Sequence, residues 1–259
     1  MPLNTAIEIE TDTCLLLFDP HENSAWLNRV LECEADRCSH FLLGGDYFDP
    51  RGDEIDGARA MARRLLELRE RFGERLTLLL GNHDIPYLWA LPWVRRQQSP
   101  RRANAPRFLP ADFSPSKAKR IGKILDDEFW RECRLFQKVN GWLVSHAGVV
   151  PAHWPVAPSP EAALMSIDRR ARHALANLHL EADPLLLPGV ARGGDTPAPG
   201  LTWADWYEEF EDALPYPQIV GHTSRHNVAR QRGRSWCLDG ARTLYGRLHR
   251  NGRLEVEEA

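Results

Sequence analysis

The chain has 259 residues, a formal net charge of −3 and a hydrophobic fraction of 43%. This length is sufficient for a complete hydrophobic core, and the slightly negative charge argues against bulk electrostatic binding of nucleic acid or membranes. The N-terminal residues lack a basic region and the apolar runs are short, so we expect neither a signal peptide nor a membrane span. The five cysteines are scattered without paired spacing, which indicates reduced thiols in a cytoplasmic protein.

In chain order, five short apolar runs each end in side chains that can bind a metal ion or transfer a proton. Apolar runs of this length are typical of buried strands. With the polar residues that follow them, they read TCLLLFDPHEN (13–23), HFLLGGDYFD (40–49), LTLLLGNHD (76–84), GWLVSHAG (141–148) and PQIVGHTSRH (217–226). Turns favour Gly, Asn and Asp for backbone reasons alone. One such run would therefore indicate little, whereas its repetition indicates a shared site.

Two segments between the first three runs have the apolar spacing of amphipathic helices. They cover residues 25–35 and 58–72, and the second has apolar side chains on one side and Arg and Glu on the other. Alternation of strand and helix predicts parallel strands joined by right-handed crossovers. Open α/β sheets bind ligands at the carboxyl ends of their strands. We therefore expect the polar residues of the five runs to converge at one rim of an α/β fold.

The side chains expected at this rim offer oxygen and imidazole nitrogen, and none offers a thiolate. They are Asp19, His21, Asp46, Asn82, His146 and His222. Such a set suits Mn, Fe, Zn, Ni or Co, and disfavours calcium or a structural cysteine-zinc site. Six protein ligands are more than one ion can bind if some of its coordination positions are to stay open for substrate. We therefore expect two ions, about 3.5–4 Å apart, that share a carboxylate.

The motifs that contain these residues occur in a recognisable order. Asp-x-His-x-Asn begins at Asp19, Gly-Asp-x-x-Asp at Gly45, Gly-Asn-His-Asp at Gly81, His-Ala-Gly at His146 and Gly-His-Thr at Gly221. Over residues 13 to about 249 the chain thus resembles the calcineurin-like metallophosphoesterase superfamily, nearest its PPP-type branch of bacterial and phage Ser/Thr-phosphatase-like enzymes. The resemblance implies a two-sheet sandwich of mixed β-sheets flanked by helices, with the metal site at the C-terminal ends of strands.

The resemblance also implies a role for each of the expected metal ligands. The first ion would be held by Asp19, His21 and Asp46. Asp46 would bridge to the second ion, whose other ligands would be Asn82, His146 and His222. Mn²⁺ and/or iron are the ions we expect, and Zn, Ni and Co also suit these ligands.

Two further residues of the third motif receive catalytic roles from the resemblance. A hydroxide would attack phosphorus, because metal binding lowers the pKa of water. His83 would protonate the leaving oxygen, and Asp84 would orient the His83 ring.

The chain departs from the family pattern at three places. Glu22 stands where a Gly usually follows the first motif His, and Ser224 stands where many members have a second metal-binding His. Pro50 stands where an Arg usually clamps the phosphate. The candidates for this clamp are Arg51, Arg192 and Arg225.

We expect a single metallophosphoesterase domain over residues 1–259, with two insertions. The first, around residues 92–120, holds eight Lys and Arg residues against one Asp. It is either a solvated flap or a cap that steers an anionic substrate towards the metals. The second, around residues 155–200, contains a helical stretch (161–180) followed by a Pro/Gly-rich loop with Arg192. This loop either approaches a phosphate closely or serves as a flexible linker.

These features predict a metal-dependent phosphoesterase that hydrolyses phosphate monoesters, for example a phosphoprotein Ser/Thr phosphatase. Two alternatives stay open. One is a phosphodiesterase or a hydrolase of nucleotides or dinucleoside polyphosphates, and the other is a metal-free binding scaffold that has kept the fold and lost the chemistry. The expected partner is a phosphorylated small molecule, nucleotide or protein, with no membrane and no obligate protein partner.

Overall fold

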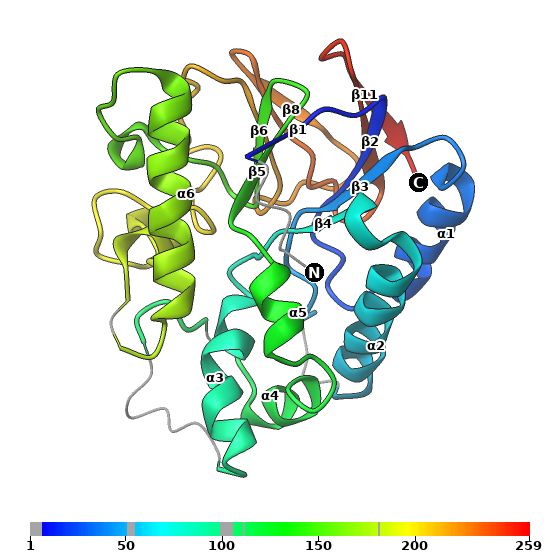
Figure 1. The fold of residues 1–259 in the computed structure, drawn as a ribbon, viewed down its shortest axis with the longest axis vertical. Coiled ribbons are helices and arrows are strands. Elements are labelled where there is room, and N and C mark those ends of the chain that lie inside the picture. The colour runs from blue at the N-terminus through cyan, green and yellow to red at the C-terminus, as the bar shows by residue number, and fades with distance from the viewer. Residues whose placement is uncertain (1–6, 51–54, 99–105, 111, 181) are drawn as a thin grey trace.

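The computed structural model describes residues 7–50, 55–98, 106–110, 112–180 and 182–259. They form two stacked β-sheets with helices around them (Figure 1). The five-stranded sheet has the order β11 (Leu254–Glu258), β10 (Leu244–His249), β2 (Thr13–Leu17), β3 (His40–Leu43), β4 (Leu76–Leu78). The six-stranded sheet has the order β1 (Glu8–Ile9), β5 (Phe136–Val139), β6 (Trp142–Ser145), β7 (Gln218–Val220), β9 (Ser235–Cys237), β8 (Arg230–Arg232). Both sheets mix parallel and antiparallel pairs, so the predicted fold class is confirmed.

In the five-stranded sheet, β2, β3 and β4 are parallel, and the helices α1 (Ser24–Glu34) and α2 (Ile55–Phe72) lie between them in the chain. Successive side chains of a strand point to opposite faces. Leu15 and Leu17 therefore pack in the core that includes both helices, whereas Cys14 and Leu16 face the other sheet. The two helices predicted at residues 25–35 and 58–72 are confirmed.

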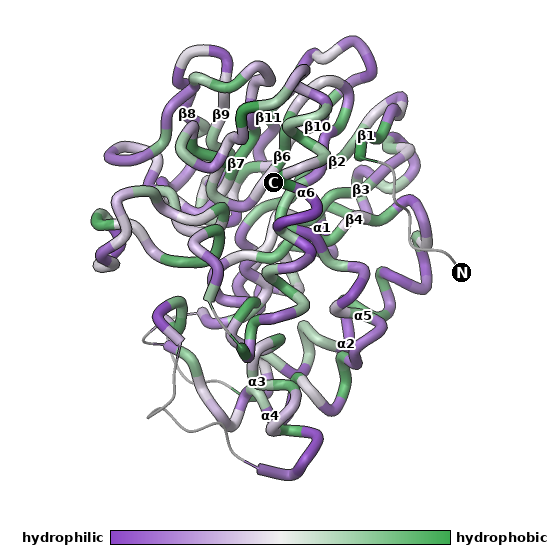
Figure 2. The backbone as a smooth tube through the Cα atoms, turned by 60° about the vertical axis from the view of Figure 1, so that its left-hand side comes forward, coloured by the Kyte–Doolittle hydropathy of each residue, from purple (hydrophilic) through white to green (hydrophobic). Residues whose placement is uncertain are grey.

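The six-stranded sheet supplies the other two motif strands. β6, β7 and β9 are parallel, while β5 and β6 form an antiparallel pair. Val144 of β6 and Ile219 of β7 pack against Leu42 of β3 between the two sheets. Figure 2 shows hydrophobic positions concentrated on the central strands and hydrophilic positions on the outer helices and turns.

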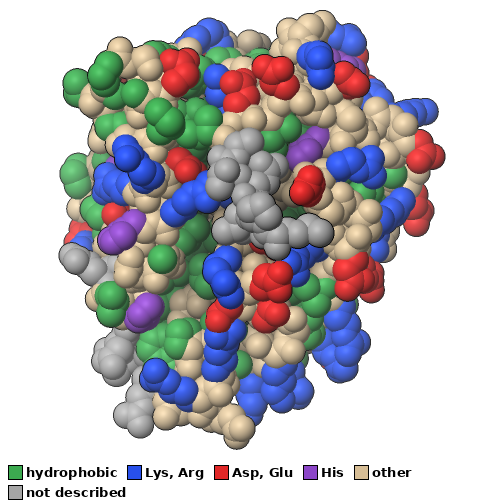
Figure 3. All heavy atoms as spheres, viewed as in Figure 1, with side chains coloured by type: hydrophobic (Ala, Val, Ile, Leu, Met, Phe, Trp, Pro, Cys, Tyr) green, Lys and Arg blue, Asp and Glu red, His purple; other side chains and the backbone are tan. Residues whose placement is uncertain are grey.

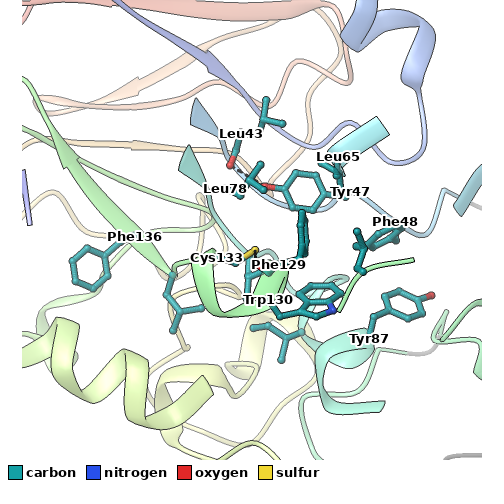
Figure 4. Packing of buried hydrophobic residues seen from close by; sticks show 14 of the residues in the cluster. Leu43, Tyr47, Phe48, Leu65, Leu78, Tyr87, Phe129, Trp130, Cys133 and Phe136 are labelled. Atoms are coloured by element: carbon teal, nitrogen blue, oxygen red, sulfur yellow. Dashed lines mark hydrogen bonds between the residues drawn. The ribbon is translucent and has the colours of Figure 1, made fainter. Parts of the chain in front are cut away.

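Helices fill the space below the sheets in the view of Figure 1. They are α3 (Ile85–Arg95), α4 (Pro115–Ile121) and α5 (Asp127–Glu132), whereas α6 (Pro160–Ala176) lies on the left, beside the sheets. Short 3₁₀ turns lie at Gly73–Arg75, Pro151–His153, Pro184–Leu186 and Val190–Arg192. Figure 4 shows the core here, with the Tyr47 ring near Leu65 and Leu78. The Tyr47 hydroxyl donates to the carbonyls of Leu43 (3.1 Å) and Leu79 (2.7 Å), which ties the loop after β3 to the strands.

The basic insertion differs from a free loop in its described part. Residues 92–95 are the last turn of α3, and residues 115–120 belong to α4, which packs against α2 and α3. Arg95 pairs with Asp127, and Arg107 pairs with Asp195. Because these cations are already paired, the positive field expected from the insertion is weakened. Arg101 and Arg102 lie outside the described residues.

The second insertion lies on the left in Figure 1. The predicted helix at 161–180 is present as α6, which ends four residues earlier, and Ser159 caps its N-terminus. Figure 3 shows hydrophobic side chains on this side of the molecule, where Met165 is exposed, and charged side chains over much of the rest. In the described part of the chain, no helix is long and apolar enough to cross a membrane.

Candidate metal centre

The loops that follow the motif strands place their polar residues through an uncommon backbone conformation. Asp19, His21, Asp46 and His222 have φ angles of 53°, 40°, 57° and 67°. Non-glycine residues seldom adopt a positive φ, and such residues cluster at functional sites, where surrounding contacts hold the strain. Two backbone hydrogen bonds provide such contacts here. The Asp19 backbone N–H donates to the Gly45 carbonyl, and the His21 backbone N–H donates to the Asp46 carbonyl.

Asp19, His21 and Asp46 form the first cluster of ligand atoms. The Nε2 atom of His21 lies 3.9 Å from Asp19 Oδ1 and 3.7 Å from Asp46 Oδ2. One donor atom from each residue lies within 4.8 Å of the others, as a shared metal ion requires. Both carboxylates are buried, at 2% exposure.

Asp46, His146 and His222 form the second cluster, which meets the same 4.8 Å criterion. The Nε2 atom of His146 is central to it, lying 3.4 Å from Asp46 Oδ2 and 3.1 Å from His222 Nδ1. Asn82 Oδ1 is 3.2 Å from the same nitrogen. The structure thus brings together all six residues expected as ligands, in two groups that share Asp46.

Hydrogen bonds to the backbone fix the orientation of these side chains. The Nδ1 atoms of His21 and His146 face the carbonyls of Phe48 (2.9 Å) and Gly44 (2.8 Å), which leaves each Nε2 directed into the cluster. Asp19 Oδ2 accepts a hydrogen bond from the His222 backbone N–H (3.0 Å). Bonds of this kind set the tautomer and the angle of a metal-binding imidazole.

Two motif glycines are required because the chain passes very close to the carboxylates. A Cβ atom on Gly81 would overlap Asp46 Oδ1, and one on Gly221 would overlap Asp19 Oδ2. Glycine alone leaves this space. The glycines of Gly-Asn-His-Asp and Gly-His-Thr are therefore part of the construction of the site.

The electrostatics of the cluster favour a bound cation. Burial, followed by the nearby Asp239, raises the pKa of Asp19 well above its usual range. Burial also acts on Asp46, but the imidazoles of His146 and His83 outweigh it and hold the pKa of Asp46 well below its usual range. Burial and the adjacent His146 lower the pKa of His222 well below its usual range. Burial lowers the pKa of His146, but the carboxylates of Asp46 and Asp19 outweigh it and raise the pKa to about 10. The cluster therefore holds protons that a divalent ion would replace, because carboxylates and imidazoles bind metals in their deprotonated forms.

The sequence-based expectation that Asp84 orients the His83 ring is wrong. His83 Nδ1 lies 3.4 Å from Asp49 Oδ2, so the carboxylate that faces the ring is Asp49 and not Asp84. Burial opposes protonation of His83, but the carboxylates of Asp46 and Asp49 outweigh it and raise the pKa of His83 to about 9. The sequence signal for Asp49 was present, as the last residue of Gly-Asp-x-x-Asp.

Asp84 instead braces the two central loops. Its carboxylate accepts hydrogen bonds from the backbone N–H groups of Gly81 (2.8 Å), Asp46 (2.7 Å) and Tyr47 (2.9 Å). The residue is completely buried. Burial and the neighbouring Asp46 raise the pKa of Asp84 to about 7, against the effect of the backbone hydrogen bonds. Asp84 therefore holds Asp46 in place and does not orient His83.

The three arginines predicted as phosphate clamps have different surroundings. Arg51 lies outside the described residues. Arg225 is exposed and lies beside the Tyr207 hydroxyl. Arg192 donates to Thr223 Oγ1 (2.9 Å), next to His222, and pairs with Asp205 (2.8 Å). Arg192 thus contacts the residue that follows His222, and its charge contributes to lowering the pKa of His222.

Sequence reasoning missed other charged residues near the site. Asp239 acts electrostatically on Asp19, and Arg242 acts on His21. Arg242 also has a positive φ of 64°. Lys117 contacts the carboxylates of Glu22 and Asp49. Asp239 and Arg242 follow the last motif His in the chain, and no motif assigned a role to them or to Lys117.

The chain has two mixed sheets, with clusters of candidate ligands at the ends of their strands. We compared it with known proteins. No family model and no curated protein sequence matches it. Among solved structures, a cold-active protein-tyrosine phosphatase from a psychrophilic Shewanella species is 20% identical, with a TM-score of 0.58 over 97% of this chain and 82% of that chain.

Two further solved structures have the same architecture. A putative diadenosine tetraphosphatase is 16% identical, with a TM-score of 0.51 over 98% of this chain and 97% of that chain. A protein serine/threonine phosphatase from Saccharomyces cerevisiae is 15% identical, with a TM-score of 0.50 over 98% of this chain and 83% of that chain. Likeness at these identities concerns the fold, and it confirms the two-sheet sandwich of mixed β-sheets flanked by helices that the sequence resemblance predicts.

Proposed function

We propose that the chain is a phosphoesterase that depends on two metal ions and hydrolyses phosphate monoesters. The observation that carries this proposal is the pair of ligand clusters that share the buried carboxylate of Asp46. A shared carboxylate is the arrangement that holds two ions close enough to act on one phosphoryl group. The phosphatase names of solved structures with this fold agree with the proposal.

The donor set fits the ions that the proposal requires. Carboxylate oxygen, amide oxygen and imidazole nitrogen suit Mn²⁺ and iron, and we propose these as the native ions. Asp19, His21 and Asp46 would hold the first, and the second would bind Asp46 together with Asn82, His146 and His222. When bound, the ions would polarise the phosphoryl oxygens and supply a nucleophile at neutral pH.

His83 is the proposed proton donor to the leaving oxygen. Its backbone N–H donates to Asp46 Oδ1 (2.9 Å), so the residue is anchored to the shared carboxylate. Its ring lies 5.4 Å from the ring of His21, at the edge of the first cluster. Asp49 on the other side of the ring favours the protonated imidazole, which is the form that a general acid needs.

Arg192 is the proposed phosphate clamp. Its Nε atom is buried and has no hydrogen-bond partner among the described residues. An unpaired buried N–H is costly, and a phosphate oxygen would satisfy it. The contact with Thr223 keeps the guanidinium beside His222, at the second cluster.

A hydrolysis panel tests the proposed function. Chelator-treated protein, with and without added Mn²⁺, is assayed on phosphotyrosine and phosphoserine peptides, nucleotides, diadenosine tetraphosphate and a bis-ester. We expect metal-dependent release of phosphate from monoesters. Metal-dependent cleavage of the bis-ester or the tetraphosphate instead would favour the phosphodiesterase or polyphosphate alternative, and turnover of none of them would favour the binding scaffold.

A further inference from the structure

Lys117 is a buried cation that comes from the basic insertion. Its side chain is 1% exposed, although the neighbouring Lys119 on the same helix is exposed. Lysine is almost never fully buried unless its ammonium group is paired. The burial of Lys117 therefore points to a specific role for its charge.

The ammonium group of Lys117 lies between two buried carboxylates. Its Nζ atom is 3.2 Å from Glu22 Oε1 and 3.2 Å from Asp49 Oδ1. Glu22 Oε1 also accepts a hydrogen bond from the Asp49 backbone N–H (3.1 Å). Asp49 Oδ1 accepts another from the Tyr87 hydroxyl (2.5 Å). These contacts occupy one oxygen of Asp49 and leave Oδ2 to face the His83 ring.

The helix that carries Lys117 is itself fixed in place. Ser114 caps α4 by accepting a hydrogen bond from the Lys117 backbone N–H (3.3 Å). The ring of Phe113 packs against Tyr87 at 5.6 Å and against Trp89 at 6.0 Å between centroids. The ammonium group is thus held by packing of α4 on α3, and a charge in a fixed position can orient a carboxylate.

The balance of charge shows why this cation matters. Two carboxylates, Glu22 and Asp49, share a pocket with 3% and 0% side-chain exposure. Without a cation they would repel each other at low dielectric, and the Asp49 side chain would lose one of its fixed partners. Displacing a catalytic group by about 1 Å can cost about 10²-fold in rate.

We infer that Lys117 is a positioning residue, which fixes the Asp49 carboxylate and through it the His83 ring. The inference rests on the proposed function, because the orientation of the His83 ring matters for catalysis only if His83 is the proton donor. It also gives the basic insertion a defined role, since α4 supplies a support of the active site. Lys117 does not touch the reacting atoms in this account.

The test compares two aryl phosphates, phenyl phosphate and p-nitrophenyl phosphate, in Lys117→Met, Lys117→Arg and the exposed control Lys119→Met. The phenolate leaving group needs a proton more than p-nitrophenolate does. We expect Lys117→Met to lower kcat on phenyl phosphate by about 10- to 100-fold, to lower it much less on p-nitrophenyl phosphate, and to leave KM nearly unchanged. Lys117→Arg should recover most of the loss, and Lys119→Met should match the wild type.

A double-mutant cycle with Asp49→Asn makes the test sharper. If Lys117 acts through Asp49, adding Lys117→Met to Asp49→Asn should lower kcat on phenyl phosphate little further. Additive losses would overturn the inference, and so would equal losses on both substrates or a rise in KM alone. Should Lys117→Met fail to fold, the same cycle is run with Lys117→Met and Glu22→Gln together, which removes one buried charge of each sign. A wild-type protein without metal-dependent activity would contradict the proposed function, a result separate from any difference among the variants.

Discussion

Replacing Asp84 should destabilise the loops of the metal centre by an amount that the structure allows us to work out. In Asp84→Asn, the amide oxygen can occupy the place of Oδ2 and accept from Gly81 and Asp46. The amide nitrogen must then face the Tyr47 backbone N–H, which is a donor and now has no acceptor. One unpaired buried N–H costs about 1–3 kcal/mol. Asp84→Ala leaves all three N–H groups unpaired and should cost roughly 3 kcal/mol or more.

The assay is urea denaturation of chelator-treated protein at pH 8. Burial raises the pKa of Asp84 to about 7, and this pH lies above it, so the carboxyl is mainly ionised. Removing metal from both proteins keeps lost metal binding out of the comparison. Asp168→Asn on α6 serves as the control, since the Asp168 carboxylate pairs with the Arg172 side chain of the same helix. If Asp84→Asn kept wild-type stability and lost only the proton-donor activity, Asp84 would be the orienter of His83 and the bracing role would be wrong.

Three further predictions concern other residues. His83→Ala should lower turnover of phenyl phosphate by about 10²-fold or more and that of p-nitrophenyl phosphate much less, as steady-state kinetics would show; equal losses would argue against a proton donor. Arg192→Ala, which removes the buried Nε, should raise KM for phosphate monoesters while metal content by elemental analysis stays unchanged. Burial, with Arg75 adding to it, lowers the pKa of His40 from 6.5 in the unfolded chain to about 4 in the folded protein. The contribution of neutral His40 to the free energy of unfolding is therefore complete above pH 6.5 and is lost as the pH falls from there towards 4. The wild type should therefore lose about 2 kcal/mol between pH 7 and pH 5, and urea denaturation of His40→Asn should show a weaker dependence, whereas equal slopes would refute the assignment.

The sequence predicted which side chains come together as candidate ligands because the evidence for their position is local. Each candidate ligand follows an apolar strand, and parallel strands bring their carboxyl ends to one edge. The same reasoning predicted α1 and α2, whose apolar spacing is regular. Nothing in this reasoning required knowledge of contacts between distant segments.

The network around His83 could not be predicted in the same way. Asp84 follows His83 in the chain, but its side chain turns towards the backbone of the loop after β3. Asp49 reaches the His83 ring through a positive φ of 60°, which a sequence pattern does not reveal. Lys117 meets Asp49 across 68 positions, because α4 packs against α2 and α3. Such long-range side-chain contacts depend on the tertiary packing.

Metal stoichiometry together with activity tests the central claim most directly. Chelator-treated protein is titrated with Mn²⁺, and bound ions per chain and hydrolysis of p-nitrophenyl phosphate are measured on the same samples, for the wild type and for Asp46→Asn. We expect two ions per wild-type chain, activity that rises as they bind, and a loss of both ions and activity in Asp46→Asn. Full activity of the metal-free wild type, or near-normal turnover with two ions bound in Asp46→Asn, would contradict a dinuclear centre built on the Asp46 carboxylate.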